Sequence, residues 1–553
     1  MHTMYLDTST IKKGDKTYTR HLLRQSYRED GKVKHRTVAN LSSCSDKEIE
    51  AIRLALRHKE DLGDFLGARE PLTERQGLSF GAVWLVYSIA REMKITNALG
   101  TGKEGKLALW QIIARVIDQG SRLSAVRLAG VQAACDVLGL GKFNEDDLYE
   151  NLDWLSENQA AIEDRLFKIL PPAEDPGIFL YDVTSSYLEG TENELAAFGY
   201  NRDGKRGKRQ VVIGLLCNAD GSPLSVEVFT GNTQDPKTFG PQIKKVAERF
   251  GAEGVTFVGD RGMIKSYQIS ELNSSGFHYI TAITKPQIEG LLETKVIQLS
   301  LFDQGLAEVK TDSGIRYVLR RNPVRAEEIR KSREDKLIVL RKALAAQNMY
   351  LNEHPRAKVT VAMGKITARS KQFKMLDWVE ISVIDRTLEL TINDNAANEA
   401  AKLDGCYILK TDLPEIKASK ETVHNRYKDL ASVEWAFRTS KTTELELRPI
   451  HVRLASRTRG HVFVVMLAYR IAQELARRWR HLDSTIQEGL DELTTLCTVE
   501  VETKDGQKYN RVPEPRQSIK ILLDAANVHL PSVIPVTGIN VTTKKKLQDR
   551  RNI

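Results

Sequence analysis

The chain has 553 residues, of which 41% are hydrophobic and 28% are charged, and its formal net charge is +9. Three or four domains are expected at this length, and the composition is that of an ordinary globular protein. The five cysteines form no CxxC pair and no run of about 18 apolar residues occurs, which argues against a zinc site, a disulfide framework and a membrane span. The cysteines fit a reducing cytoplasm, and the positive charge favours a polyanionic partner.

Residues 1–72 are predicted to form a small basic α/β region. Short strands flank a Glu-Asp-Gly-Lys turn at residues 29–32, and an amphipathic helix is expected between about 46 and 70. The basic residues of the region are Arg20, Arg24, Arg28, Lys32, Lys34 and Arg36.

Residues 73–170 show the apolar spacing of helices and predict a compact bundle, which we interpret as a helical DNA-binding domain behind the basic arm. Within it, residues 100–106 match GxGxxG and nearly match a nucleotide P-loop. Leu107 stands where the P-loop needs Ser or Thr, and the segment before the glycines reads as a helix. A helix-to-helix turn is therefore expected there instead of a nucleotide site.

A Pro171-Pro172 boundary leads into a segment that is rich in strands. Asp220-Gly221 marks a hairpin, and a helix is expected at about 238–250. The predicted strands are 177–188, 211–217, 224–229, 255–259 and 278–284. Strands in this order, with a helix between them, favour a mixed sheet with helices packed on it.

Two of these apolar strands run into an aspartate, Asp182 and Asp260. One such aspartate is more often a turn residue or a helix cap than a ligand, but it must face solvent, a donor or a metal. Far downstream, Tyr427, Glu434 and Lys441 lie one heptad apart on a predicted helix at 427–441 and share one helix face. Three carboxylates in one site would suit a pair of Mg²⁺ ions, which take oxygen ligands and activate phosphodiesters.

The segment 201–209, close to the first aspartate, is dense in positive charge. Such a run is usually only solvated, but beside a carboxylate triad it becomes a candidate for holding a DNA backbone. Its candidate DNA-binding residues are Arg202, Lys205, Arg206, Lys208 and Arg209.

The sheet is predicted to be interrupted at 286–404 by a β-rich insertion that also carries a charged helix at about 325–349. Trp378 within it is either a core anchor or a stacking platform for an unpaired base. The sheet returns at 405–409, so residues 171–285 and 405–480 together would form one domain. Residues 481–553 are expected to form a C-terminal tail with a possible role in dimerisation.

The chain resembles the bacterial insertion-sequence transposases that have a DDE catalytic triad. Tyr427, Glu434 and Lys441 match the spacing of their Tyr-Arg-Glu-Lys signature, and the resemblance covers most of residues 20–475. One position departs from the signature, because Leu430 stands where the family has Arg. Further matching segments are Asp182-Val183-Thr184-Ser185, Gly231-Asn232-Thr233, Gly259-Asp260-Arg261-Gly262-Met263, Gly405-Cys406-Tyr407 and Phe437-Arg438-Thr439-Ser440-Lys441.

The resemblance implies an α/β fold with an RNase H-like mixed sheet, flanked by helices and interrupted by the insertion. It implies a transposase that binds the terminal inverted repeats of its own element, cuts at the element ends and joins the 3′-OH ends to target DNA. Asp182, Asp260 and Glu434 would be the catalytic residues and would hold two Mg²⁺ (or Mn²⁺) ions. Tyr427 and Lys441 would grip the phosphate next to the scissile bond. We expect Arg438 to replace the missing Arg, and the alternative is that Arg438 only pairs with an acidic residue.

The expected partners are the terminal repeats, target DNA and a second copy of the chain in a homodimer, and the expected location is the bacterial nucleoid in the cytoplasm. Two alternatives stay open from the sequence. One is an RNase H-like metal-dependent nuclease without strand transfer, and the other is a DNA-binding derivative that has lost catalysis. The presence of all three carboxylates and of Lys441 counts against the second alternative.

Overall fold

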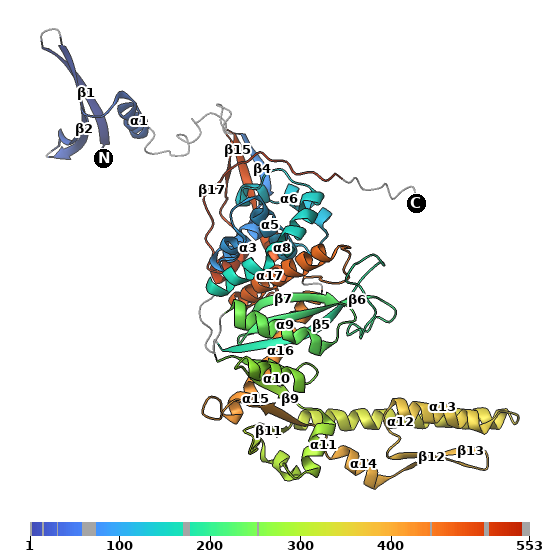
Figure 1. Ribbon diagram of the computed structural model, residues 1–553. Helices are drawn as coiled ribbons and strands as arrows, with labels where there is room; N and C mark the ends of the chain where they lie inside the picture. Colours follow the sequence, from blue (N-terminus) through green and yellow to red (C-terminus); the bar gives the residue numbers. More distant parts are fainter. Residues whose placement is uncertain are drawn as a thin grey trace. The chain divides into compact units, whose positions relative to one another are not determined.

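The computed structural model describes residues 3–13, 16–29, 31–57, 73–169, 177–250, 254–442, 445–502 and 508–544 (Figure 1). The chain divides into two compact units. The first comprises Met1–Leu78, Cys497–Glu514 and Pro531–Val536, and the second comprises Ser79–Leu496, Pro515–Leu530 and Thr537–Ile553. The predicted tail therefore contributes to both units.

In the residues that the structure describes, the first unit contains two sheets and one helix. Strands β1 (Thr3–Lys13), β2 (Lys16–Glu29) and β3 (Lys32–Asn40) pair in that order and are longer than the short strands expected there. Helix α1 (Asp46–Arg57) begins where Ser45 and Glu48 cap each other's backbone N–H groups.

The second sheet of this unit joins a strand from the start of the chain to strands from its end. Its order is β17 (Val533–Ile534), β16 (Lys508–Arg511), β15 (Cys497–Glu502) and β4 (Thr73–Ser79). Residues 73–79 were expected to be helical, so β4 corrects that prediction. Gly77 packs so tightly on β15 that an added Cβ would lie 2.1 Å from Thr498 Oγ1, which explains a glycine at this position.

A helical layer opens the second unit and shares its core with a helix from much later in the chain. Its helices are α3 (Gly81–Glu92), α4 (Ile95–Leu99), α5 (Lys103–Ile117), α6 (Arg122–Val131), α7 (Ala134–Leu138) and α8 (Glu145–Ile169). Gly100 and Gly102 form a turn between α4 and α5, as predicted, in place of a nucleotide loop. The largely buried helix α17 (Ala455–Trp479) packs against α5 and α8 (Figure 1).

The largest sheet has eight strands in the order β10-β11-β14-β9-β8-β5-β6-β7. The strands that carry the expected RNase H-like order are β5 (Ile178–Tyr187), β6 (Gln210–Asn218), β7 (Pro223–Thr230), β8 (Thr256–Gly259) and β9 (His278–Ala282). β5, β6 and β7 form an antiparallel meander, and β8 and β9 run parallel to β5. The protein is thus an α/β protein with a large mixed sheet flanked by helices.

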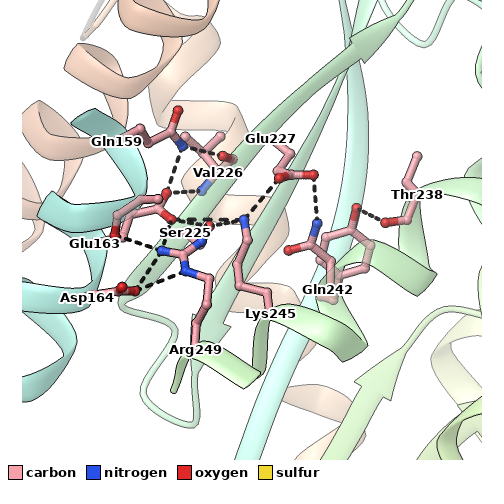
Figure 2. Close-up of polar contacts among 12 residues, drawn as sticks. Gln159, Glu163, Asp164, Ser225, Val226, Glu227, Thr238, Gln242, Lys245 and Arg249 are labelled. Carbon is pink, nitrogen blue, oxygen red and sulfur yellow. Dashed lines mark hydrogen bonds and ion pairs between the residues drawn. The ribbon is translucent and has the colours of Figure 1, made fainter. Parts of the chain in front are cut away.

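The helix α9 (Asp235–Lys244), the π-helical turn η1 (Lys245–Arg249) and α10 (Ser266–Ser274) contribute to the core on one face of this sheet. That core is rich in aromatic side chains, among them Phe179, Tyr181, Phe239 and Phe257. A buried polar network at η1 connects α8 to β7 (Figure 2). In it, Glu163 accepts a hydrogen bond from the hydroxyl of Ser225, which also accepts one from Lys245 Nζ.

The region predicted as an insertion, 286–404, consists of two parts. Strands β10 (Ala307–Lys310) and β11 (Arg316–Arg321) extend the large sheet through β14 (Cys406–Thr411). They follow α11 (Lys285–Glu293) and the short helix η2 (Leu299–Gln304). The remainder has its own hydrophobic core, and Trp378 is buried in it, which matches the core-anchor interpretation of this residue.

This second part contains more helix than the β-rich insertion that was expected. Its elements are α12 (Pro323–Glu353), α13 (Val359–Gln372), β12 (Val379–Ile384), β13 (Thr387–Ile392) and α14 (Asp394–Ala401). Asn322 caps α12 by accepting from the Arg325 N–H, and Pro323 occupies its first turn. Ion pairs of Arg330 with Glu327 and Glu334 at i,i+3 and i,i+4 spacing support its exposed face.

The predicted single helix at 427–441 is two helices, α15 (Lys420–Lys428) and α16 (Leu430–Lys441). At Asp429 the backbone tightens to φ −62° and ψ −17°, and its carbonyl accepts from the N–H of Ser432, three residues on. This is 3₁₀ geometry, which interrupts the α-helical ladder. Tyr427 therefore lies on a different helix from Glu434 and Lys441.

The tail of the second unit adds α18 (Ile486–Thr494) and α19 (Gln517–Ala525). The predicted turn at Asp505-Gly506 and the basic residues beyond Lys544 lie outside the described residues, although β15 and β16 pair as an antiparallel hairpin there. Within the described part of the chain, no helix is long and apolar enough to cross a membrane.

Candidate active site

Strand register brings the two aspartates together. β5 and β8 are neighbouring parallel strands in which Tyr181 pairs with Gly259. Asp182 and Asp260 are the next residues along the two chains, and neighbouring strands lie about 4.8 Å apart. Asp260 is exposed just beyond the end of β8, and Asp182 is half-buried within β5.

Glu434 is supplied by α16, which packs against β5. Asp182 and Thr184 point to the same face of β5 because side chains alternate along a strand. Lys441 Nζ, at the end of α16, donates to Thr184 Oγ1 at 2.6 Å, so α16 lies on the face that carries Asp182. Glu434 is exposed and lies about two helical turns before Lys441.

The three carboxylates influence one another electrostatically. Burial, together with the negative charges of Asp260 and Glu434, raises the pKa of Asp182 to about 7. The backbone N–H of Val183, 2.7 Å from Asp182 Oδ1, and the guanidinium of Arg202 act in the opposite direction. A carboxylate placed beside two others is stabilised in its charged form by a cation.

Carboxylate oxygens are the ligands that Mg²⁺ and Mn²⁺ prefer, so the chemistry of this set of residues fits a divalent cation. The geometry is looser than that of a coordination shell. In the residues that the structure describes, no group of three or more His, Cys, Asp or Glu side chains is arranged to hold a metal ion.

Tyr427 extends from α15 to the second aspartate. Its hydroxyl donates to Asp260 Oδ1 at 3.3 Å. Burial, the charge of Asp260 and this hydrogen bond raise the pKa of Tyr427, so the phenol keeps its proton and acts as a donor. Tyr427 thus contacts the carboxylate that follows β8.

Lys441 is buried and held by Asp203, a residue that sequence reasoning missed. Asp203 Oδ1 accepts from Lys441 Nζ at 3.0 Å and from Arg448, and Oδ2 accepts from the backbone N–H of Tyr187 at 3.2 Å. The side chains of Lys441 and Asp203 are only 8% and 1% exposed. The one signal in the sequence was that Asp203 is the only acidic residue in the basic run 201–209.

The predicted basic residues of this run are largely engaged within the protein. Arg202 donates to both oxygens of Asp235 at 2.6 Å, and Lys208 pairs with Glu189 at 2.7 Å. Arg209 donates to the carbonyl of Thr191 and lies over the ring of Phe198. Lys205 and Arg206 are exposed, with the Lys205 amine 5.8 Å from the centre of the Tyr187 ring.

Arg438, the expected replacement for the missing signature arginine, is exposed on α16. Its guanidinium lies over the ring of Trp435 at 5.8 Å, and the ring itself is 58% exposed. Leu430, at the position of the missing arginine, is buried. Within the described residues no ion pair of Arg438 occurs, although such pairing was the competing interpretation of this side chain.

Two family models match the chain. The model of the IS1634 family transposase N-terminal domain matches residues 6–70, and the model of the transposase DDE domain matches residues 173–471. The second match spans more than half of the chain and contains all three carboxylates. The chain therefore belongs to the DDE transposases of insertion sequences.

Other comparisons add little to this assignment. A comparison with curated proteins finds no significant match. Among solved structures, the chain is similar to the piggyBac transposase in its synaptic complex with hairpin DNA, with 9% identity over 83% of this chain and 82% of that chain. The TM-score is 0.35, and nothing below rests on this likeness.

Proposed function

We propose that this transposase binds the terminal inverted repeats of its own insertion sequence, cleaves DNA at the element ends and joins the 3′-OH ends to target DNA. The observation that carries the proposal is the match of residues 173–471 to the transposase DDE domain, and the electrostatic influence of Asp260 and Glu434 on Asp182 supports it. The match of residues 6–70 to a transposase N-terminal domain supports DNA as the partner. DDE transposase domains in general use divalent metal ions.

In this proposal Asp182, Asp260 and Glu434 hold two Mg²⁺ (or Mn²⁺) ions. When bound, the ions would activate the attacking oxygen and stabilise the leaving 3′-oxygen of an in-line displacement. Tyr427 orients the carboxylate of Asp260 through its hydroxyl. The contact of Lys441 with Thr184 and Asp203 holds the end of α16, and with it Glu434, against β5.

DNA phosphates would be contacted around this site by the exposed cations. Lys205, Arg206 and Arg438 are exposed and available for this role, and Arg202 could exchange Asp235 for a phosphate. Recognition of the terminal repeats is assigned to the basic N-terminal region and the helices that follow it. We further propose that two copies of the chain pair the two element ends as a homodimer.

The test uses the full chain and a plasmid that carries the DNA flanking its reading frame. Wild-type protein should nick at the element ends when Mg²⁺ is present, and Asp260→Asn should abolish nicking. Binding in a gel shift should survive, because Asp260 is assigned as a metal ligand and not as a phosphate contact. Nicking by the Asn variant at close to the wild-type rate would show that the triad is misassigned.

A joining assay separates transposition from simple hydrolysis. Pre-cut element ends with free 3′-OH groups are incubated with the chain, Mg²⁺ and a supercoiled target. Covalent joining of the ends to the target supports a transposase. Efficient nicking without any joined product would instead support the nuclease alternative.

A further inference from the structure

A second group of cations surrounds a cavity of about 200 Å³ that is formed by α5, α6, α8 and the segment between α16 and α17. At about 30 Å³ per water molecule, this volume has room for a phosphate group with a few waters. None of the residues around it belongs to the carboxylate site. The residues that line the cavity include Arg115, Arg122, Tyr149, Glu446, His451 and His461.

Arg115 is 5% exposed and is bonded only to neutral groups. Its guanidinium donates to the backbone carbonyls of Gln119, Gly120 and Leu445. Its Nε atom is buried and has no hydrogen-bond partner in the described part of the chain. A buried charged donor in this state costs free energy until an acceptor reaches it.

Arg122 is also 5% exposed and also lacks a carboxylate partner among the described residues. It donates to Gln111 Oε1 at 2.7 Å, and its other terminal nitrogen lies 3.0 Å from His461 Nδ1. Burial, together with the neighbouring charge of Arg115, lowers the pKa of Arg122 to about 9. Two buried guanidiniums that repel each other across a cavity favour an anion between them.

We propose that this cavity is a phosphate-binding site, taking either a DNA backbone phosphate or inorganic phosphate. Arg115 and Arg122 supply the positive charge. Backbone carbonyls hold the guanidinium of Arg115 in place, and Gln111 and His461 hold that of Arg122. Tyr149 adds a hydroxyl at the wall, and Glu446 is the one acidic residue of the lining among the residues that the structure describes. Glu446 is exposed and opposes anion entry.

The first experiment titrates the full chain with inorganic phosphate at constant ionic strength and follows binding by calorimetry and by the unfolding temperature. Wild-type protein should bind saturably, and Arg122→Gln should weaken binding about tenfold or more, as expected for a lost charge-assisted hydrogen bond. Arg330→Gln is the matched control, because Arg330 is exposed on α12 and far from the cavity in sequence. Equal binding by wild type, Arg122→Gln and Arg330→Gln would overturn the site.

The Arg122→Gln protein could fail to fold, because the substitution removes a buried side chain. A second variant is therefore used that should change the affinity for phosphate in the opposite direction. Glu446→Gln changes an exposed side chain and removes the negative charge that the described lining carries, so phosphate should bind roughly threefold tighter or better. Damage to the fold does not produce tighter binding. An unchanged or weaker affinity in Glu446→Gln would count against the site even if Arg122→Gln cannot be purified.

Measurements of DNA binding show whether the phosphate in the site belongs to DNA or is a free anion. If the site takes a DNA phosphate, Arg122→Gln should lower the salt-dependence slope of duplex binding by about one unit, and inorganic phosphate should compete with DNA. An unchanged slope together with lost phosphate binding identifies the free anion as the ligand. These readouts need no cleavage, so they stay distinct from a failure of the proposed transposition chemistry.

Discussion

At the scale of single residues, the clearest departure from expectation is the environment of Lys441. A signature lysine was expected to grip DNA, yet its amine is buried between Thr184 and Asp203. Asp203 also accepts from Arg448, so one buried carboxylate pairs with two cations. These contacts position α16 against β5, and we infer that Lys441 first serves the geometry of the site.

This arrangement predicts a large effect of removing the charge of Asp203. Asp203→Asn leaves Lys441 buried without its partner, which costs about 3–5 kcal/mol when a buried pair is broken. The measurement is the unfolding temperature of the full chain by calorimetry. Asp303→Asn is the control, because its pair with Arg321 is largely exposed and is worth about 1 kcal/mol at most. Similar small shifts in both variants would contradict the positioning role.

At the scale of elements, helices from the first third of the chain are tied to the sheet by buried polar groups. The network in Figure 2 joins α8 to β7 and η1 through Glu163, whose side chain is 1% exposed. Glu163 accepts from Gln159 and from the backbone N–H of Val226, and it pairs with Arg249 at 3.2 Å. Lys245, only 7% exposed, lies 3.9 Å from Glu163.

Removing Glu163 alone should destabilise the chain more than removing both Glu163 and Lys245. Glu163→Leu leaves Lys245 buried beside fewer acceptors and should destabilise the chain by about 3–5 kcal/mol. Adding Lys245→Met should restore part of that loss, because an apolar pair of similar size needs no solvation. Thermal unfolding of the two single variants and the double variant measures the coupling. Additive losses would mean that Lys245 does not depend on Glu163.

The contact between α17 and α6 predicts a dependence of stability on pH. Burial first, and then the charges of Arg122 and Arg115, hold the pKa of His461 well below its ordinary value of 6.5. Below about pH 6.5 the unfolded chain therefore binds a proton that the folded chain excludes. The contribution of His461 to stability is complete above that pH and is lost as the pH falls.

We expect the unfolding temperature to fall from pH 7.5 to pH 5.5, and to fall less in His461→Gln. Glutamine keeps an acceptor for Arg122 but does not titrate in this range. His481→Gln serves as the control, since His481 is exposed. Identical pH profiles of wild type and His461→Gln would show that other groups set the dependence.

At the scale of the whole molecule, the helices of residues 73–170 do not stand alone. α5 and α8 pack against α17, most of which lies within the match to the transposase DDE domain at residues 173–471. Most residues of α17 between Thr458 and Ala472 are buried. The region interpreted as a separate DNA-binding domain thus shares a hydrophobic core with residues 455–479.

A fragment of residues 1–170 should therefore lack a cooperative unfolding transition in calorimetry, because the faces of α5 and α8 that α17 covers would be exposed to water. The full chain is the reference, and a chain of residues 73–553 is the control that retains α17. A sharp transition of the 1–170 fragment would show that the helical layer folds without α17.

Local patterns in the sequence predicted much of the fold and singled out the three carboxylates as candidates. Runs of apolar residues predicted β5 and β8, and Asp220-Gly221 predicted the hairpin of β6 and β7, because buried strands and tight turns each leave a local pattern. The heptad spacing of Tyr427, Glu434 and Lys441 indicated a shared surface but not the two helices that carry these residues. The glycine turn at residues 100–102 was predicted on the same grounds.

Only the tertiary structure decided which distant groups meet. Asp203 with Lys441, Arg115 and Arg122 around one cavity, and β10 and β11 at the edge of the large sheet each depend on the path of the chain between the partners. Periodicity records that a side chain is buried but not what it is buried against, because that partner comes from another element. The break at Asp429 was also missed, because one 3₁₀ turn leaves the spacing of the residues in the sequence unchanged.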